Sequence, residues 1–181
     1  MNPIRSFSLI LLLLFAAVAS AQTPSQDVQK RVSPDAYTAA PPTIRAELKK
    51  QHCELPEVQH WDQTRLNIVP GHFGDRLQND WAAICIGSNG STHVIVFWGK
   101  SAPCPAEIHD GWALQGHFKA GEAGSLYLLT AQANQILEYR KFFGDPHENP
   151  VIHEGIEVGG DEASLIYYCH QGKWLELQGN D

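Results

Sequence analysis

DWAAICIGSNGSTHVIVFW, residues 80–98, is the stretch that decides the fold. Two runs rich in Ile, Val and aromatic residues, Trp81–Ile86 and His93–Trp98, lie on either side of a short polar segment, and such runs favour β-strands. Asn89-Gly90 is typical of a tight hairpin turn, because both residues tolerate a positive φ. The stretch predicts an antiparallel β-hairpin; we favour this turn over the alternative that Asn89 marks an N-glycosylation sequon.

Similar strand signals recur along the chain from Leu66 onward. Leu126–Thr130 is mostly apolar, and the runs Leu165–Tyr168 and Trp174–Leu177 are close enough in sequence to form a final hairpin. We therefore expect a mainly β (α+β) fold: an antiparallel sheet or sandwich of β-hairpin modules, with an N-terminal helix and one mid-chain helix.

Two segments carry the signals of those helices. Ile44–Gln51 follows Thr43, which we expect to cap the helix at its amino end. Asn134–Phe143 has apolar residues spaced for one helix face, and the next residue, Gly144, is typical of a helix carboxyl end.

The first residues have the pattern of a secretory signal peptide. The apolar run Leu9–Val18 precedes Ala19-Ser20-Ala21, a small-residue cleavage site. The run is shorter than the roughly 20 apolar residues that span a bilayer. We expect residues 1–21 to be a signal peptide cleaved after Ala21, and the protein to be periplasmic or secreted. Residues 22–40 are expected to be a disordered linker and 41–181 a single disulfide-stapled β-rich domain.

The charge of the chain limits its partners. There are 20 Asp and Glu against 13 Lys and Arg, a net charge of −7, and the longest basic run is Lys49-Lys50. This argues against nucleic acid and against an anionic membrane surface as partners. No second apolar run is long enough for a transmembrane anchor in the mature chain. We expect an envelope or extracellular protein or glycan as the partner, and no cofactor.

The four cysteines are expected to form two disulfides, because an exported chain meets an oxidising compartment. They contain no C-x-x-C pair, which disfavours a zinc ribbon or a thioredoxin-type site. Of the three possible pairings we favour Cys53–Cys85 and Cys104–Cys169, although the sequence alone does not choose between them. The first would tie the N-terminal helix to a central strand, and the second would tie a mid-chain loop to the final hairpin.

Three segments of equal length, each opening on Gly and ending in an apolar run, align without gaps: 71–85, 116–130 and 155–169. Their spacing suggests a repeated β-hairpin module. The first has Gly71-His72-Phe73, then Asp80 before an apolar strand, and Val94–Gly99 as the next strand. Around residues 71–99 it resembles an FG-GAP or VCBS repeat, a family whose acidic loop binds calcium.

The calcium ligands of that family are largely missing here. The positions of its alternating Asp and Asn oxygens hold His72, Gly74 and Arg76, and only Asp80 remains. Calcium takes six to eight oxygen ligands. We therefore expect the loop not to bind calcium, and Asp80 to cap the turn before Trp81.

Most of the mature chain also resembles an uncharacterised family of short exported bacterial proteins. The likeness lies in Pro42-x-Ile44, Cys53, Asp80-Trp81-Ala82, His153–Ile156 and Gly172–Gly179 with the terminal Asp181. This resemblance implies a bacterial envelope protein and implies no activity.

Histidines and carboxylates gather in DPHENPVIHEGIE, residues 145–157. His147, His153 and Glu154 are residue types that can hold a transition metal. A metal-dependent hydrolase using His147, His153 and a nearby carboxylate is thus one hypothesis. The prolines in this segment indicate a loop, and the spacing matches no helical H-E-x-x-H motif.

Five tryptophans are many for a domain of this size. Trp81, Trp98 and Trp174 lie in predicted strands and are expected in the core, while Trp61 and Trp112 lie in loops and are candidate ligand-facing aromatics. No G-x-S-x-G elbow, P-loop or Rossmann glycine pattern is present. The function that the sequence favours is a non-catalytic binding or structural module of the bacterial envelope.

Overall fold

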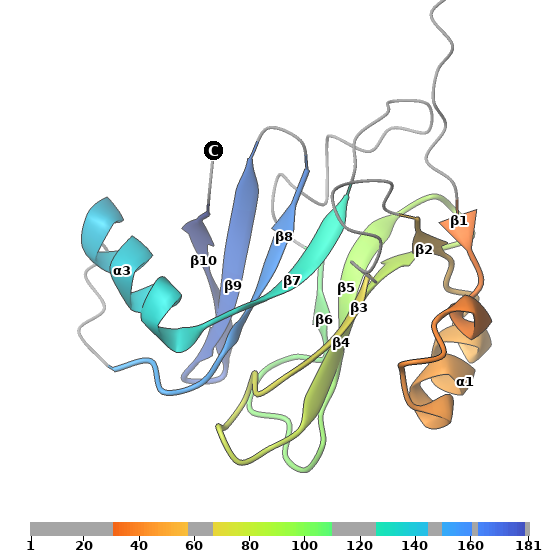
Figure 1. The fold of residues 1–181 in the computed structure, drawn as a ribbon, viewed down its shortest axis with the longest axis horizontal. Coiled ribbons are helices and arrows are strands. Elements are labelled where there is room, and N and C mark those ends of the chain that lie inside the picture. Colours follow the sequence, from red (N-terminus) through yellow and green to blue (C-terminus); the bar gives the residue numbers. More distant parts are fainter. Residues whose placement is uncertain (1–30, 58–66, 110–125, 145–149, 161–162, 180–181) are drawn as a thin grey trace, which may run out of the picture.

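The computed structural model describes residues 31–57, 67–109, 126–144, 150–160 and 163–179. A four-stranded antiparallel sheet, which we name the first sheet, has the strand order β3-β4-β5-β6 (Figure 1). Its strands are β3 (Ile68–Gly71), β4 (Asp80–Ile86), β5 (Thr92–Phe97) and β6 (Glu107–Ile108).

The second sheet is also four-stranded and antiparallel, with the order β10-β9-β8-β7. Its strands are β7 (Tyr127–Ala131), β8 (Gly155–Gly159), β9 (Ser164–His170) and β10 (Lys173–Gln178). A short pair, β1 (Arg31–Val32) and β2 (Leu55–Pro56), lies beside the first sheet, where Glu54 bridges to Ile86. With two longer helices added, the expected mainly β (α+β) class is confirmed.

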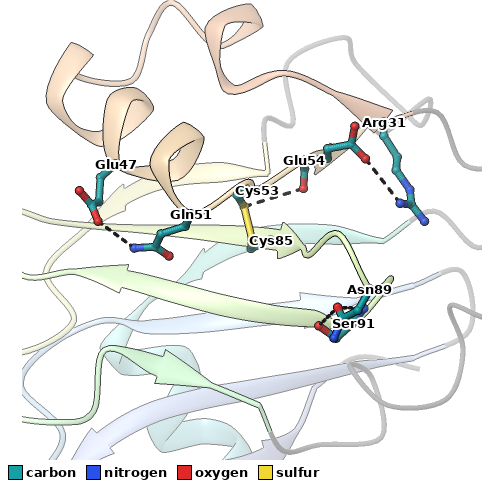
Figure 2. The surroundings of a disulfide bond; sticks show 8 residues. All are labelled: Arg31, Glu47, Gln51, Cys53, Glu54, Cys85, Asn89 and Ser91. Atoms are coloured by element: carbon teal, nitrogen blue, oxygen red, sulfur yellow. Dashed lines mark hydrogen bonds and ion pairs between the residues drawn. A yellow bond between two sulfur atoms is a disulfide. The ribbon is translucent and has the colours of Figure 1, made fainter.

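The hairpin predicted from residues 80–98 is present. β4 and β5 pair from Trp81 opposite Phe97 to Ile86 opposite Thr92. The turn has Gly90 at a φ of 81°, and the side chain of Asn89 accepts a hydrogen bond from the backbone of Ser91 at 3.0 Å (Figure 2). The positive φ that Asn-Gly sequences tolerate is thus used at Gly90.

The two sheets face each other and share one core. Side chains alternate along a strand, so every second residue of β4 and β5 points toward the second sheet. This inner core is a cluster of aliphatic and aromatic side chains from both sheets: Phe73, Ala82, Ile84, Val94, Val96, Ile108, Leu126, Leu128, Ile156, Val158, Leu165 and Tyr167. Trp98 and Trp174 pack against it. The sequence predicted either an antiparallel sheet or a sandwich, and the structure is a sandwich.

A helix covers the outer face of each sheet (Figure 1). α1 (Pro42–Lys50) buries Ile44 and Leu48 against the remaining residues of β4 and β5, together with partly buried Trp81. α3 (Ala133–Phe143) buries Ile136 against β9 and β10. The order of layers is therefore helix, sheet, sheet, helix.

Both helix predictions are close, with one error at an end. α3 ends where predicted, at Gly144, whose φ of 68° is the left-handed conformation that glycine adopts at helix ends. α1 begins at Pro42, and no side chain caps it; the prediction that Thr43 caps the helix is wrong. Proline suits the first helical position because its missing N–H would have no helical partner there.

The prediction of a disordered linker over residues 22–40 extends too far. Residues 31–40 contain β1 and a 3-10 turn, Pro34–Ala36, and they bury Tyr37 and Ala40 against α1. The Tyr37 hydroxyl donates to the backbone of Pro56 at 3.3 Å, and burial, with a further effect of Glu57, raises the pKa of Tyr37 to about 12. These partners are distant in sequence, so local composition does not reveal them. The signal peptide lies outside the described residues.

The two disulfides have the predicted pairing. Cys53–Cys85 joins the end of α1 to β4, with Cα atoms 5.2 Å apart (Figure 2). Cys104–Cys169 joins the loop before β6 to β9, with Cα atoms 5.9 Å apart. The second disulfide therefore links the two sheets to each other.

Two of the three aligned segments can be compared with the structure. In each, a strand begins at the matching residue, Asp80 or Ser164, opposite a glycine. However, the aligned Gly71 and Gly155 differ, since Gly71 closes a hairpin and Gly155 begins β8. Residues 116–125 lie outside the described residues. The internal repeat stays a prediction.

Candidate functional site

The sheets approach each other along two seams, and the seam between β3 and β7 is closed by hydrogen bonds. The Thr130 hydroxyl donates to the carbonyl oxygen of Pro70 at 2.8 Å. At the other end of β3, the buried amide of Asn67 donates to the carbonyl oxygen of Leu126 at 3.0 Å. Pro70 lies on the β3 edge of the first sheet. Because proline has no backbone N–H, it leaves no donor unpaired at this edge.

Glu154, a candidate metal ligand in the sequence, also closes this seam. One carboxylate oxygen accepts the backbone N–H of His72 at 2.8 Å, and the other accepts the side-chain amide of Gln132 at 2.9 Å. The backbone N–H of Glu154 donates to the carbonyl oxygen of His72 at 3.0 Å. Its carboxylate therefore holds the loop before β8 against the loop after β3.

His153 has a structural position as well. Its Nδ1 lies 2.8 Å from the carbonyl oxygen of Glu154, and its Nε2 lies 2.8 Å from that of Cys169. With both ring nitrogens against carbonyl oxygens, neither is aimed at a shared metal position. The described residues contain no group of three or more His, Cys, Asp or Glu side chains arranged to hold a metal ion. His147 lies outside the described residues.

Asp80 organises the loop between β3 and β4. It is fully buried, and its carboxylate accepts hydrogen bonds from the backbone N–H groups of Gly74 at 3.1 Å and Gly99 at 2.9 Å, and from the side-chain amide of Gln78 at 2.6 Å. Gln78 in turn exchanges hydrogen bonds with the backbone of Ser101. Both carboxylate oxygens of Asp80 thus accept N–H donors of the chain itself.

Replacement of Asp80 tests this arrangement. Asp80→Ala should lower the free energy of unfolding by about 3 kcal/mol or more, because it leaves three inward-facing N–H donors without an acceptor. Asp75→Ala is the control: Asp75 is exposed and accepts one local hydrogen bond from Leu77, so the loss should be about 1 kcal/mol or less. Urea unfolding of both variants measures the difference, and equal losses would contradict the assigned role of Asp80.

The second seam, between β6 and β10, is open along part of its length. A cleft of about 390 Å³ lies there. Its lining residues are Pro105, Glu107, Ile108, His109, Tyr167, Gly172, Lys173, Trp174 and Glu176. Ile108 and Tyr167 belong to the inner core and form an apolar floor, whereas Glu107, His109 and Glu176 are exposed at the rim. We name this the β6–β10 cleft.

One end of the β6–β10 cleft is fixed. The indole N–H of Trp174 donates to the carbonyl oxygen of Pro105 at 2.9 Å, and its ring stacks on that of Trp98 with 5.8 Å between centroids. The Cys104–Cys169 disulfide lies at the same end. Trp174 and Trp98 are partly buried, in agreement with their expected place at the core. Trp61 and Trp112 lie outside the described residues.

A larger hollow, about 480 Å³, lies at the closed seam. Its polar lining includes Thr130, Gln132 and Glu154, and each of these side chains already forms a hydrogen bond within the protein. The β6–β10 cleft is smaller, but it has an apolar floor formed by Ile108 and Tyr167. We therefore take the smaller cleft as the candidate site.

Two histidines and a carboxylate form a cluster near β6, and two of the three residues, Glu107 and His109, line the cleft. The rings of His93 and His109 stack with centroids 5.0 Å apart, and Nε2 of His109 lies 2.6 Å from a carboxylate oxygen of Glu107. Burial lowers the pKa of His93, and the charge of His109 lowers it further, while Glu107 acts in the opposite direction. The folded state therefore favours neutral His93.

This shift predicts a pH dependence of stability. Below about pH 6.5, His93 becomes protonated in the unfolded chain, whereas in the folded protein it stays neutral until the pH reaches its lower pKa. The free energy of unfolding therefore has its full value above about pH 6.5. It falls as the pH drops toward the pKa of His93 in the folded state. His93→Gln should remove this part of the pH dependence of the melting temperature. His52→Asn, at an exposed residue whose φ of 55° suits Asn, should leave it unchanged. The interpretation is wrong if His93→Gln melts with the same pH dependence as the wild type.

A scan against protein-family models and searches of curated proteins and of solved structures found no match to this chain. The case for a function therefore depends on the site itself.

Proposed function

We propose that this protein is an exported protein of the bacterial envelope and a non-catalytic binding module whose binding site is the β6–β10 cleft. The signal-peptide pattern and the resemblance to exported bacterial proteins support export. Two disulfides are compatible with an oxidising compartment. Among the described residues, no helix has the length and apolar character needed to cross a membrane.

The single observation that carries the binding role is the difference between the two seams. At the seam between β3 and β7, the polar side chains that line the hollow form hydrogen bonds within the protein. The hollow at the other seam has an apolar floor and an exposed polar rim. Ligand sites are commonly hollows of about 300–1,000 Å³ with this kind of lining. The volume of the cleft lies near the lower end of that range, and two of its lining residues, Tyr167 and Trp174, are aromatic.

The residues of the cleft favour binding over catalysis. The pair formed by Glu107 and His109 lies at the exposed rim, where water reaches both side chains. Among the described residues that line the cleft, none is a Ser, Thr or Cys that this pair could activate as a nucleophile.

Site-specific crosslinking in the native bacterium tests the proposal. A photoreactive phenylalanine analogue at position 176 should yield one defined adduct in the envelope fraction, and excess wild-type protein should abolish the adduct. The control is the same analogue at Lys50, which is exposed on α1 at the far side of the molecule. Retention in the cytoplasm, no adduct from position 176, or the same adduct from both positions would contradict the proposal.

A further inference from the structure

We infer that the β6–β10 cleft binds an extended peptide segment of a partner protein, which adds to the sheet as a strand beside β10. This inference rests on the proposed function and names the class of ligand. It follows from the direction of the backbone groups on the two strands that border the cleft.

The register of β10 shows which of its residues direct their backbone groups away from β9. The hairpin pairs Lys173 with His170, and the N–H of Gly179 donates to the carbonyl oxygen of Ser164 at 2.8 Å. In an antiparallel pair every second residue directs its N–H and C=O toward the neighbouring strand. The odd-numbered residues of β10 therefore bond to β9, and Trp174 and Glu176 direct their backbone groups away from β9.

The register of β6 gives the same result on the other side. The N–H of Val96 donates to the carbonyl oxygen of Ala106 at 2.7 Å, and Glu107 is opposite Ile95. By the same alternation, the N–H and C=O of Glu107 point away from β5. In the part of the chain that the structure describes, β6 pairs only with β5 and β10 only with β9. Both strands bordering the cleft are thus sheet edges.

A polypeptide matches these edges better than another ligand. An unpaired edge presents N–H and C=O groups at every second residue, which is the pattern that another extended backbone satisfies. On β10, Trp174 and Glu176 each offer one N–H and one C=O to such a strand. Side chains of the bound strand on the inner side would meet the apolar floor of Ile108 and Tyr167.

The charges of the cleft indicate the composition of that peptide. His109 is already paired with Glu107. Glu176 and the exposed Lys173 both line the cleft, and neither has an ion-pair partner among the described residues. The cleft therefore offers a bound segment one charge of each sign, on a chain whose net charge is −7. Complementary charge favours the association and its register, so the partner segment should carry Lys or Arg opposite Glu176.

Peptide selection with two variants at position 176 tests the inference. The probe is a phage-displayed library of random dodecapeptides, selected against the full exported chain. Selected peptides should contain Lys or Arg. Glu176→Ala removes one exposed charge and should weaken binding by less than about fivefold. Glu176→Pro also removes the outward N–H and should weaken binding by at least about tenfold relative to Glu176→Ala. Because that N–H has no partner among the residues that the structure describes, both variants should melt at similar temperatures.

Leu175→Pro is the matched control for the register. It removes an N–H that faces β9, so it should lower the melting temperature strongly. Glu176→Pro should not, because the N–H of Glu176 faces away from β9. If both proline variants unfold, amide hydrogen exchange of the wild-type protein, measured with and without a selected peptide, tests the inference instead. A selected peptide should then slow the exchange of Trp174 and Glu176 specifically.

Two outcomes would overturn the inference while leaving the proposed function in place. One is equal affinity of selected peptides for Glu176→Pro and Glu176→Ala, with unchanged amide exchange at positions 174 and 176. The other is failure to select any peptide while the protein binds a glycan array, or while two copies associate through the cleft. Loss of the position-176 crosslink in the bacterium would instead contradict the proposed function itself.

Discussion

The burial of both faces of both sheets is the constraint on which the rest of this structure depends. Alternate side chains of β4 and β5 pack inward against the second sheet and outward against α1, and those of β9 pack inward against the first sheet and outward beside α3. A sheet buried in this way has only its edges left for contact with other molecules. The state of each edge therefore decides where the protein can bind.

The two seams between the sheets are held by different interactions. Near β3 and β7, buried or inward-facing polar side chains such as Asn67, Glu154 and Asp80 satisfy the backbone groups of neighbouring segments. Near β6 and β10, a disulfide and a tryptophan pair hold one end and the rest stays open. Unpaired strand edges favour association with further strands. The Cys104–Cys169 disulfide and the hydrogen bond from Trp174 to Pro105 join the two sheets at the fixed end of the cleft.

Local sequence was enough to predict the features set by local physics. The Asn89-Gly90 turn and the end of α3 at Gly144 agree with the structure. The favoured disulfide pairing also agrees, although the sequence alone did not choose between the three pairings. The features that were missed depend on contacts between distant residues. Tyr37 is ordered by α1 and Pro56, and the role of Gln78 depends on Ser101. The cleft was not predicted, because Glu107 and Glu176 come together only when the two sheets pack. His153 was proposed as a metal ligand from residue type alone, without knowledge of the carbonyl oxygens that face its ring.

The openness of the β6–β10 edge is the central claim of this account, and amide hydrogen exchange along β10 in the free wild-type protein tests it most directly. The account predicts alternation: Trp174 and Glu176 exchange fast because their N–H groups point away from β9, and Leu175 and Leu177 exchange slowly because theirs are paired. Slow exchange at all four amides would contradict the account, since it would mean that another segment already covers this edge.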